Sequence, residues 1–547
     1  MTNNIKQLLE NTINKIYSDI IDDQQVNFTV ERPNNDKYGD FSSNIALKLA
    51  SVIKKNPILI AENIVEEIKD KNKMIEKIEI VKPGFINFFI KDSYFQNIVE
   101  DVLSENRNYK KTNFGKNKKV QVEFVSANPT GPLTIGHGRQ AVLGDTISRI
   151  LEWNGYEVTR EYYFNDAGRQ MRLLGESVYA RYMELLGEKL KIPKDGYEGG
   201  YIKDIAKLFL ENYGEKYRNN QSEKIFIDFS TEYMLRSIKS TLKKLNIIHD
   251  AYFNEKTLYD NGKIDEILKK LEQKGSTYES EGAIWFKTTE FGAEKDRVLV
   301  KSSGEPTYRL PDIAYHAQKL EQDYDQIIDI FGADHHATYP DVVSALKLMD
   351  YDTSKIKVLL HQFVTLVRKN KKIKMSTRKG DFITLDELIS IAGSDVVRYF
   401  FIMRNMGSHL NFDIELAQKE TDENPVYYLQ YAHARISNVI KHSKLKEIGS
   451  FEDGNIELLK EKEEIDILKV ISEFEETMEL CFTTLEPMYL ANYLHKLATY
   501  FHKFYQRHRV VTENKELSKS RLKLIKSIKI IFSNCLNILG IEAPENM

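Results

Sequence analysis

Residues 120–139 read V-Q-V-E-F-V-S-A-N-P-T-G-P-L-T-I-G-H-G-R, and they constrain the fold more than any other part of the chain. Apolar and polar residues alternate over 120–124, Pro and Gly then interrupt the pattern, and apolar residues return at helical spacing. The order predicts a strand, a tight loop and a helix. Gly136 and His137 would then stand at the helix N-terminus, where free N–H groups and the helix dipole favour phosphate oxygens. A short loop of this kind also occurs without a ligand, so the loop alone is weak support for a phosphate site.

A second cationic loop follows in the other half of the chain, where residues 374–380 read K-M-S-T-R-K-G. A His-bearing loop followed by a K-M-S loop resembles the paired motifs of class I aminoacyl-tRNA synthetases. In that family the two loops clamp the phosphates of ATP while the amino-acid carboxylate attacks the α-phosphorus. The resemblance therefore implies an ATP site assembled from both loops.

Longer strings narrow the resemblance to one family. They are S-A-N-P-T-G-P-L-x-x-G-H-G-R at 126–139, Y-F-N-D at 163–166, G-A-D-H-H at 332–336 and Y-A-H-A-R at 431–435. Together with K-M-S they resemble the arginyl-tRNA synthetases of bacterial type, over nearly the whole chain. This implies an α/β fold: a Rossmann-like class I catalytic core, an α+β N-terminal domain and an all-α C-terminal anticodon-binding bundle. It implies a ligase that makes arginyl-adenylate and pyrophosphate from arginine and ATP, then moves arginine to the 3′-terminal adenosine of its tRNA.

Length, charge and cysteine content set further bounds. A chain of 547 residues is too long for one hydrophobic core, and a net charge of -3 means that RNA must be met by local basic patches. Cys481 and Cys535 stand far apart without a C-x-x-C, so we expect two small core residues and neither a disulfide framework nor a zinc site. No membrane-length apolar run or export signal is visible, so we expect a cytoplasmic protein without membrane contact.

Changes of composition along the chain suggest its domain organisation. The polar stretch 106–119 reads as a solvated linker, and 455–539 has no Gly and an apolar helical periodicity that predicts a bundle with its aromatic stripe in the core. Short apolar runs predict strands at 85–90, 158–164, 297–301, 327–332 and 358–367, with the last three completing one sheet. We expect the following domains: 1–105 N-terminal and tRNA-elbow-binding, 106–119 linker, 120–423 catalytic with a mostly helical connective insertion at 169–290, and 424–547 anticodon-binding.

Catalysis of adenylate formation needs positioning and stabilisation of negative charge on phosphate oxygens more than covalent chemistry. The family motifs usually have His where this chain has Thr134 and often Lys where it has Thr377, which leaves Arg378 or Lys379 to supply the last cation. Without the K-M-S motif around it, Lys374 would be interpreted as an ordinary surface lysine. The resemblance implies catalytic roles for Thr134, Gly136, His137, Lys374, Ser376, Arg378 and Lys379.

The nucleotide should lie at the carboxyl ends of the strands, where such sheets bind ligands. Asp334 or His335 would reach the ribose, and Phe363 and Val364 would contact adenine. Two adjacent histidines also suit a metal, but a third ligand at usable spacing is not visible, so we expect no metal site and take ATP with Mg²⁺ as the substrate complex. The expected ATP contacts are Pro129, Gly131, Gly136, His137, Gly332, Asp334, His335, Val364, Lys374 and Met375.

The planar guanidinium of arginine is best held by carboxylates. Glu123 within a strand and Asp312 at a helix start are the candidates, although an internal salt bridge and a helix-terminal charge would explain them individually. Such a site would reject lysine without an editing domain, because lysine leaves buried hydrogen bonds unmade. The family pattern implies arginine contacts at Glu123, Ser126, Asn128, His137, Tyr308 and Asp312.

Anticodon bases are recognised by aromatic faces and edge hydrogen bonds. The candidate tRNA contacts are Asn44, Asn87, Tyr427, Gln430, His433, Arg435, Arg507 and Met547. The expected partners are arginine tRNA, L-arginine and ATP, with the chain acting as a monomer. Two alternatives stay open: another class I synthetase or small nucleotidyltransferase, and a non-catalytic RNA-binding relative, which Thr134 and Thr377 allow.

Overall fold

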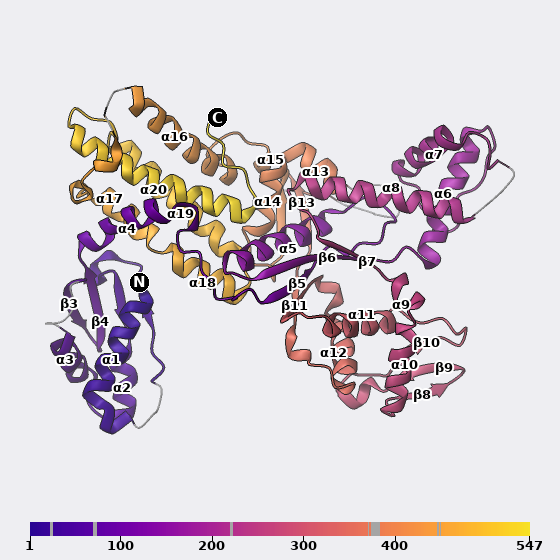
Figure 1. Ribbon diagram of the computed structural model, residues 1–547, viewed down its shortest axis with the longest axis horizontal. Helices are drawn as coiled ribbons and strands as arrows, with labels where there is room; N and C mark the ends of the chain where they lie inside the picture. The colour runs from indigo at the N-terminus through magenta and orange to yellow at the C-terminus, as the bar shows by residue number, and fades with distance from the viewer. Residues whose placement is uncertain are drawn as a thin grey trace.

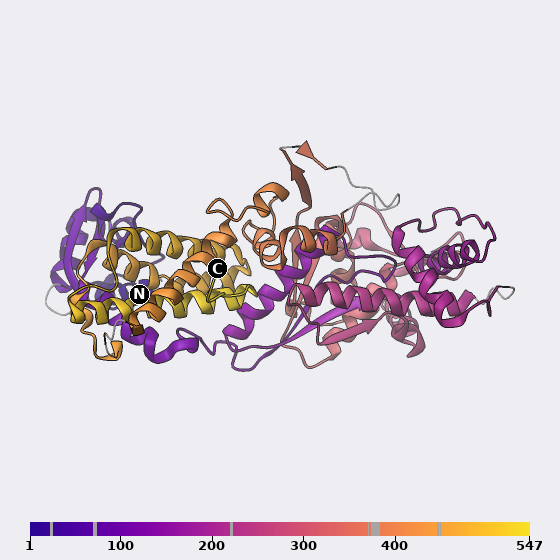
Figure 2. The same ribbon diagram turned by 90° about the horizontal axis from the view of Figure 1, so that it is seen from above.

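The computed structural model shows an elongated molecule with a parallel sheet at its centre (Figures 1 and 2). The N-terminal α+β part and the C-terminal helices lie together at one end, and the insertion helices lie at the other. Lys374, Met375, Ser376, Arg378 and Lys379 fall outside the described residues. The described residues are 1–21, 26–68, 74–218, 223–369, 371–373, 383–445, 448 and 450–547.

The central sheet has five parallel strands in the order β12-β11-β5-β6-β7. Glu123 at the end of β5 is in register with Asp329 on β11 and with Glu161 on β6. Three carboxylates therefore stand side by side near the edge where the carboxyl ends of these strands meet. The strands are β5 (Lys119–Glu123), β6 (Glu157–Phe164), β7 (Ala251–Asn254), β11 (Gln326–Gly332) and β12 (Ile356–His361).

The predicted strand, loop and helix at 120–139 are present as β5 and α5 (Ile135–Trp153). The helix is buried along nearly its whole length and packs against the sheet on one side and C-terminal helices on the other. Gly144 makes this close approach possible, because a Cβ there would lie 2.2 Å from the ring of Phe124. A larger residue at this position would push the helix away from the sheet.

Two predicted strands differ from the observed ones. Residues 358–367 form two strands, since β12 joins the central sheet while β13 (Val364–Arg368) pairs with β15 (Leu410–Asp413) and β14 (Lys371–Lys372). The expectation that 297–301 completes the central sheet is wrong, because β10 (Arg297–Val300) pairs with β9 in a separate antiparallel sheet. Apolar alternation marks a strand but does not identify its partner.

The expected insertion at 169–290 is not one continuous excursion, because β7 returns to pair with β6. The first part is helical and has its own apolar core, and the second part adds short helices and the antiparallel sheet β10-β9-β8 before α11 and α12. The elements are α6 (Gly168–Leu185), α7 (Gly200–Tyr213), α8 (Glu223–Lys244), α9 (Lys256–Asp260), α10 (Lys263–Gln273), β8 (Thr277–Ser280), β9 (Ala283–Phe286), α11 (Arg309–Glu321) and α12 (Tyr339–Leu348).

The N-terminal part is a four-stranded antiparallel sheet, in the order β1-β2-β4-β3, with helices packed on it. Residues 106–119 are mostly exposed, as predicted, but Tyr109 is 3% exposed and stacks on Phe474 at 6.0 Å, which anchors this segment to the C-terminal helices. The elements are α1 (Thr2–Ile21), β1 (Val30–Glu31), β2 (Phe41–Ser43), α2 (Ile45–Ile53), α3 (Pro57–Ile68), β3 (Ile75–Val81), β4 (Phe85–Ile90) and α4 (Asp92–Glu105).

The C-terminal part is helical, and its aromatic stripe lies in the core as predicted, with Phe501 and Phe504 fully buried. Cys481 and Cys535 are free and buried, also as predicted. In the described part of the chain, no helix is both long and apolar enough to cross a membrane. The helices are α13 (Leu385–Ala392), α14 (Ser394–Ile402), α15 (Ile414–Ala417), α16 (Pro425–Leu445), α17 (Lys462–Ile471), α18 (Phe474–Thr484), α19 (Met488–Arg507) and α20 (Lys515–Leu539).

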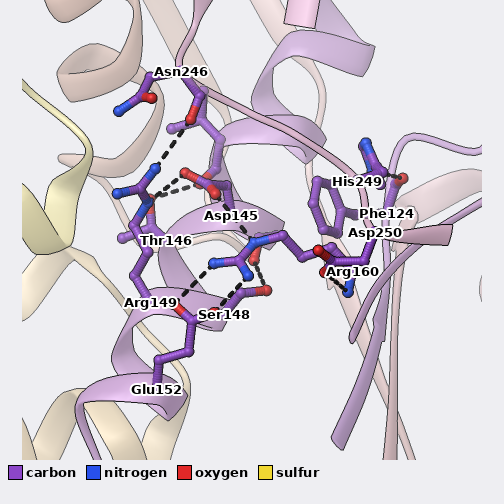
Figure 3. A network of polar contacts seen from close by, with 12 residues as sticks. Phe124, Asp145, Thr146, Ser148, Arg149, Glu152, Arg160, Asn246, His249 and Asp250 are labelled. Carbon is purple, nitrogen blue, oxygen red and sulfur yellow. Dashed lines mark hydrogen bonds and ion pairs between the residues drawn. The ribbon is translucent and has the colours of Figure 1, made fainter. Parts of the chain in front are cut away.

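A buried junction ties α5 to the insertion and to the C-terminal helices. Asp145 on α5 accepts from Arg149 at 2.8 Å and from Arg398 at 2.7 Å (Figure 3 shows Asp145 with Arg149 and Arg160). Arg398 also donates to the carbonyls of Leu245 at 2.6 Å and Leu539 at 2.8 Å. These carbonyls follow or end α8 and α20, and cations are favoured at helix C-termini. The junction fixes the direction of the helix whose N-terminus carries His137.

Candidate active site

A cavity of about 400 Å³ opens at the carboxyl end of the central sheet. Its walls come from β5, β6, the first turn of α5, α11, and the segments that follow β11 and β12. This is the place and size expected for a small-molecule site in an open parallel sheet. The lining residues are Glu123, Val125, Ser126, Thr134, Gly136, His137, Gln140, Tyr163, Asp312, Tyr315, His316, Phe331, Gly332, Asp334, His335, Thr338, Tyr339, Val342, His361 and Phe363.

The first turn of α5 presents donors to the cavity. Thr134 caps the helix. The His137 N–H donates to the Thr134 hydroxyl, and the Thr134 N–H donates to His137 Nδ1 at 3.2 Å. Because Nδ1 accepts, the ring proton of neutral His137 lies on Nε2. Burial lowers the pKa of the imidazole to about 4, so His137 is a neutral donor at physiological pH. A Cβ on Gly136 would approach only the Thr134 hydroxyl, at 3.7 Å, so the glycine leaves the helix end open.

The backbone after β5 is strained where it borders the cavity. Val125 and Ser126 have φ values of 75° and 43°, a left-handed conformation that side chains rarely adopt and that costs about 1–3 kcal/mol per residue. Hydrogen bonds hold it in place, since the Ser126 hydroxyl donates to Glu123 at 2.7 Å and accepts from the Tyr163 N–H at 3.1 Å. The strain turns the chain out of the sheet and brings Ser126 beside the carboxylate.

The side chains that pair with this row of carboxylates come from α11. Lys319, with 1% of its side chain exposed, donates to Glu123 and, at 2.6 Å, to Asp329. His316 Nε2 lies 3.1 Å from the second oxygen of Asp329, and the Tyr315 hydroxyl donates to Glu161 at 2.6 Å. The prediction for Glu123 left a salt bridge and a ligand contact as alternatives; the structure gives it the salt bridge and also places it on the cavity wall.

Burial and neighbouring charges shift the acid–base behaviour of this group. Burial, with smaller contributions from Glu255 and Glu123, raises the pKa of Asp312 to about 7, while His316 and Lys319 act in the opposite direction. Burial alone would lower the pKa of Lys319, but Asp329 and Glu123 reverse this and raise it above its usual value. Asp312 therefore titrates near neutrality, while Lys319 stays charged.

The structure brings most of the predicted cavity residues together. Asp312 stands in the first turn of α11, opposite the phosphate loop, as its position after Pro311 suggested. The predicted residues that line the cavity are Glu123, Ser126, Thr134, Gly136, His137, Asp312, Gly332, Asp334, His335 and Phe363.

Several predicted contacts lie elsewhere. Asn128 is held by Gln170 at 3.1 Å, and Gly131 faces Tyr201, 3.1 Å from where its Cβ would be. Of the predicted pair Phe363 and Val364, Phe363 lines the cavity, whereas Val364 packs against the core at the start of β13. A motif gives the order of residues along a loop, but packing decides which of them face the ligand. The predicted residues outside the cavity lining are Asn128, Pro129, Gly131, Tyr308 and Val364.

Tyr308, a predicted arginine contact, lies clearly outside the cavity. It is 58% exposed, its ring lies 4.7 Å from the Arg309 guanidinium, and it borders a different hollow of about 510 Å³ that also contains Trp285. The position before α11 leaves it outside the buried stripe of the helix. Tyr163 and Tyr315 supply the aromatic hydroxyl groups near the carboxylates instead.

Sequence reasoning missed a polar stripe on α11 and one histidine. Asp312, Tyr315, His316 and Lys319 follow the i, i+3, i+4, i+7 spacing of one helix face, a signal that was visible in the sequence. His361 at the end of β12 is 5% exposed, and burial lowers its pKa to about 4. Among the described residues its Nε2 has no hydrogen-bond partner, so this nitrogen is available to a ligand in the cavity.

The C-terminal helices form a second concave surface, a groove of about 1490 Å³. The Arg435 guanidinium lies 4.4 Å from the ring of Tyr431 and 5.0 Å from that of Tyr505. Met547 is 53% exposed at its edge. Aromatic faces with an arginine plane suit unstacked bases. Of the predicted tRNA contacts, the groove contains Arg435, Arg507 and Met547.

The other predicted tRNA contacts do not reach that groove. His433 is 2% exposed and bonded to Pro544 and Ser533, and Gln430 donates to Asp395 at 2.7 Å. Tyr427 stacks on Tyr431 at 6.0 Å without lining the groove. The His433 and Gln430 side chains are thus engaged in internal hydrogen bonds.

Both predicted N-terminal contacts use their side-chain oxygens within the protein. Asn87 is 1% exposed and accepts from the Ser42 hydroxyl at 2.7 Å, and the side-chain oxygen of Asn44 accepts from the Thr29 N–H at 2.9 Å. These hydrogen bonds give both asparagines a role inside the N-terminal part.

Comparison with curated proteins gives matches over the full length. An arginine–tRNA ligase of Desulfotalea psychrophila is 47% identical over 522 residues, covering 95% of this chain and 95% of that protein. The chain belongs to the arginyl-tRNA synthetase family. The arginine–tRNA ligase of Thermotoga petrophila is 42% identical over 552 residues, covering 100% of both chains. The family resemblance drawn from the motifs is confirmed.

Family models match three segments of this arginyl-tRNA synthetase family member. They are described as arginyl tRNA synthetase N terminal domain over 3–90, tRNA synthetases class I (R), catalytic domain over 98–400, and DALR anticodon binding domain over 429–547. The structure of Thermus thermophilus arginyl-tRNA synthetase superposes with a TM-score of 0.77 over 100% of both chains at 21% identity, which supports the fold. The predicted fold class is confirmed.

Proposed function

We propose that the cavity binds L-arginine and ATP, and that the protein makes arginyl-adenylate there before transferring arginine to the 3′-terminal adenosine of its tRNA. One observation carries this proposal: Glu123 and Asp312 face the same cavity as the N-terminus of α5 with His137. One side suits a cation and the other suits phosphates.

In the first step a carboxylate oxygen of arginine bonds to the α-phosphorus of ATP, and the bond to pyrophosphate breaks. Nε2–H of His137 and the N–H groups of α5 would donate to phosphate oxygens as their negative charge grows. Lys374, Ser376, Arg378 and Lys379 are proposed, from the motif alone, to add positive charge. Mg²⁺ would enter with the ATP phosphates as part of the substrate complex.

Selection of arginine would rest on Asp312 and Glu123. A planar guanidinium offers paired donors in fixed directions and can make bidentate contacts with a carboxylate, whereas an ammonium is a compact point charge without that paired geometry. The Lys319 ammonium already occupies one oxygen of Glu123, so the substrate would share that carboxylate with it. Asp312 would therefore be the main counter-ion of the substrate.

The C-terminal groove would receive the anticodon of arginine tRNA, with bases stacking beside Tyr431 and Arg435. Arg507 and Met547 would line the same path. We propose that the chain acts as a monomer, because one copy contains both the cavity and the groove, and that it acts in the cytoplasm, where tRNA is charged.

Pyrophosphate exchange into ATP, measured over a panel of amino acids with and without tRNA, tests the proposal. Exchange that requires arginine is expected, and exchange with another amino acid would overturn the pocket assignment. Asp312→Asn should lose it, whereas Asp323→Asn, a matched change at a carboxylate 96% exposed, should keep it. tRNA binding without exchange under any condition would favour the non-catalytic relative.

A further inference from the structure

A buried arginine holds one wall of the cavity in place. Arg139 stands two residues after His137 on α5 and is fully buried. Its guanidinium donates to three backbone carbonyls: Gln362 at 2.7 Å, Ser408 at 3.0 Å and Asn405 at 3.0 Å. The first turn of α5 is thereby bound to two segments that lie more than 200 positions away in the sequence.

These two segments also bind each other. The Gln362 N–H donates to the Met406 carbonyl at 2.9 Å, and the Phe363 carbonyl accepts from the Leu410 N–H at 3.2 Å. Phe363 is 56% exposed and lines the cavity. The turn at 405–410 therefore holds Phe363, and with it one wall of the cavity, in position.

A side chain from the C-terminal helices also binds this turn. Glu486, between α18 and α19, accepts from the side-chain amide of Asn405 at 2.7 Å and from the Met406 N–H at 3.2 Å. The Asn405 side-chain oxygen in turn accepts from the Gly407 N–H at 2.9 Å. One carboxylate thus orders a turn whose carbonyls hold Arg139.

We propose that Glu486 is a positioning residue for the ATP half of the site. Its carboxylate fixes the turn at 405–410, the turn and Arg139 fix Phe363 against the first turn of α5, and Phe363 borders the space assigned to the nucleotide. The arginine side of the cavity is built on β5, β6 and α11, which make no bond to this turn among the described contacts. Removing the carboxylate therefore weakens the use of ATP and spares the use of arginine. The inference rests on the proposed function.

The test compares KM for ATP and KM for arginine in aminoacylation by the full chain. Glu486→Ala should raise KM for ATP about tenfold and leave KM for arginine within about twofold, the size expected for losing hydrogen bonds to a charged acceptor. Glu486→Gln, which keeps one acceptor, should fall between. The matched control is Glu476→Ala, which removes a carboxylate of the same helical part that binds Thr2 and Arg32.

A double-variant cycle separates positioning from loss of fold. Asn405→Ala alone should raise KM for ATP, and adding it to Glu486→Ala should raise KM by less than the two single effects combined, because the two side chains share a hydrogen bond. Equal changes in both KM values, or a lower Tm with unchanged KM values, would overturn the inference. A wild-type chain without arginine-dependent activity would instead refute the proposed function.

Discussion

Asp312 makes the use of arginine depend on pH. Burial beside Glu255 and Glu123 raises its pKa to about 7, so the free site carries a neutral carboxyl for about half of the time at pH 7. A guanidinium stays charged throughout this range and needs the anion as partner. Because the pKa is raised, the competent form is present above pH 7 and is lost as the pH falls through 7.

The size of the effect follows from that pKa. The ionised fraction of Asp312 falls from about 0.9 at pH 8 to about 0.1 at pH 6, so KM for arginine should rise about tenfold between them. His137 and His361, with pKa values lowered to about 4 by burial, stay neutral over this interval. KM for ATP should therefore change little.

The assay is aminoacylation between pH 6 and 8 with each substrate varied in turn. Asp312→Asn should raise KM for arginine by roughly 30- to 1000-fold, from about 2–4 kcal/mol of lost charge pairing, and should flatten its pH profile. A steep profile that persists in Asp312→Asn would refute the argument and assign the titration to a neighbour such as His316, whose pKa Asp329 raises despite burial.

Unfolding offers an independent check on the same carboxyl. Its folded-state pKa lies above the unfolded value of 3.8, so the stability it contributes is present at low pH and lost as the pH rises through 7. The full shift corresponds to about 4 kcal/mol, and partial solvent contact reduces this. Asp312→Asn should therefore increase the free energy of unfolding at pH 8 by about 1–2 kcal/mol and by less at pH 5.

Three further substitutions test the packing around the site by urea unfolding. Lys319→Met leaves Asp329 without its buried cation and should cost about 3–5 kcal/mol at pH 8, and less at pH 5 where the freed carboxylate can take up a proton. Gly144→Ala places a methyl 2.2 Å from the Phe124 ring and should cost about 1–3 kcal/mol, partly recovered by Phe124→Leu, while an unchanged midpoint would contradict the close approach. Arg398→Met removes the buried donor to two helix ends and should cost about 3–5 kcal/mol; a loss below 1 kcal/mol would contradict its structural role.

The sequence predicted the parts of the site that depend on local order. The strand, loop and helix around His137 follow from periodicity and turn chemistry, and they were found where expected. Lys319 could not be paired with Glu123 from the sequence, because 196 positions separate them and only the placement of α11 beside β5 and β11 brings them together. Tyr308 shows the converse, because a residue that matches the motif is exposed and does not line the cavity.

The salt bridge of Glu123 with Lys319 and its position on the cavity wall are compatible with each other. Three carboxylates in register on neighbouring parallel strands repel one another, and burial makes their charge costly, so the fold needs a cation from α11. Lys319 pairs with Glu123 and Asp329, and His316 pairs with Asp329, but neither lies in an ion pair with Asp312, which relieves its own cost by keeping its proton near neutral pH. An incoming guanidinium can replace that proton. The charge arrangement around the cavity therefore leaves Asp312 as a carboxyl that can pair with a cation in the cavity.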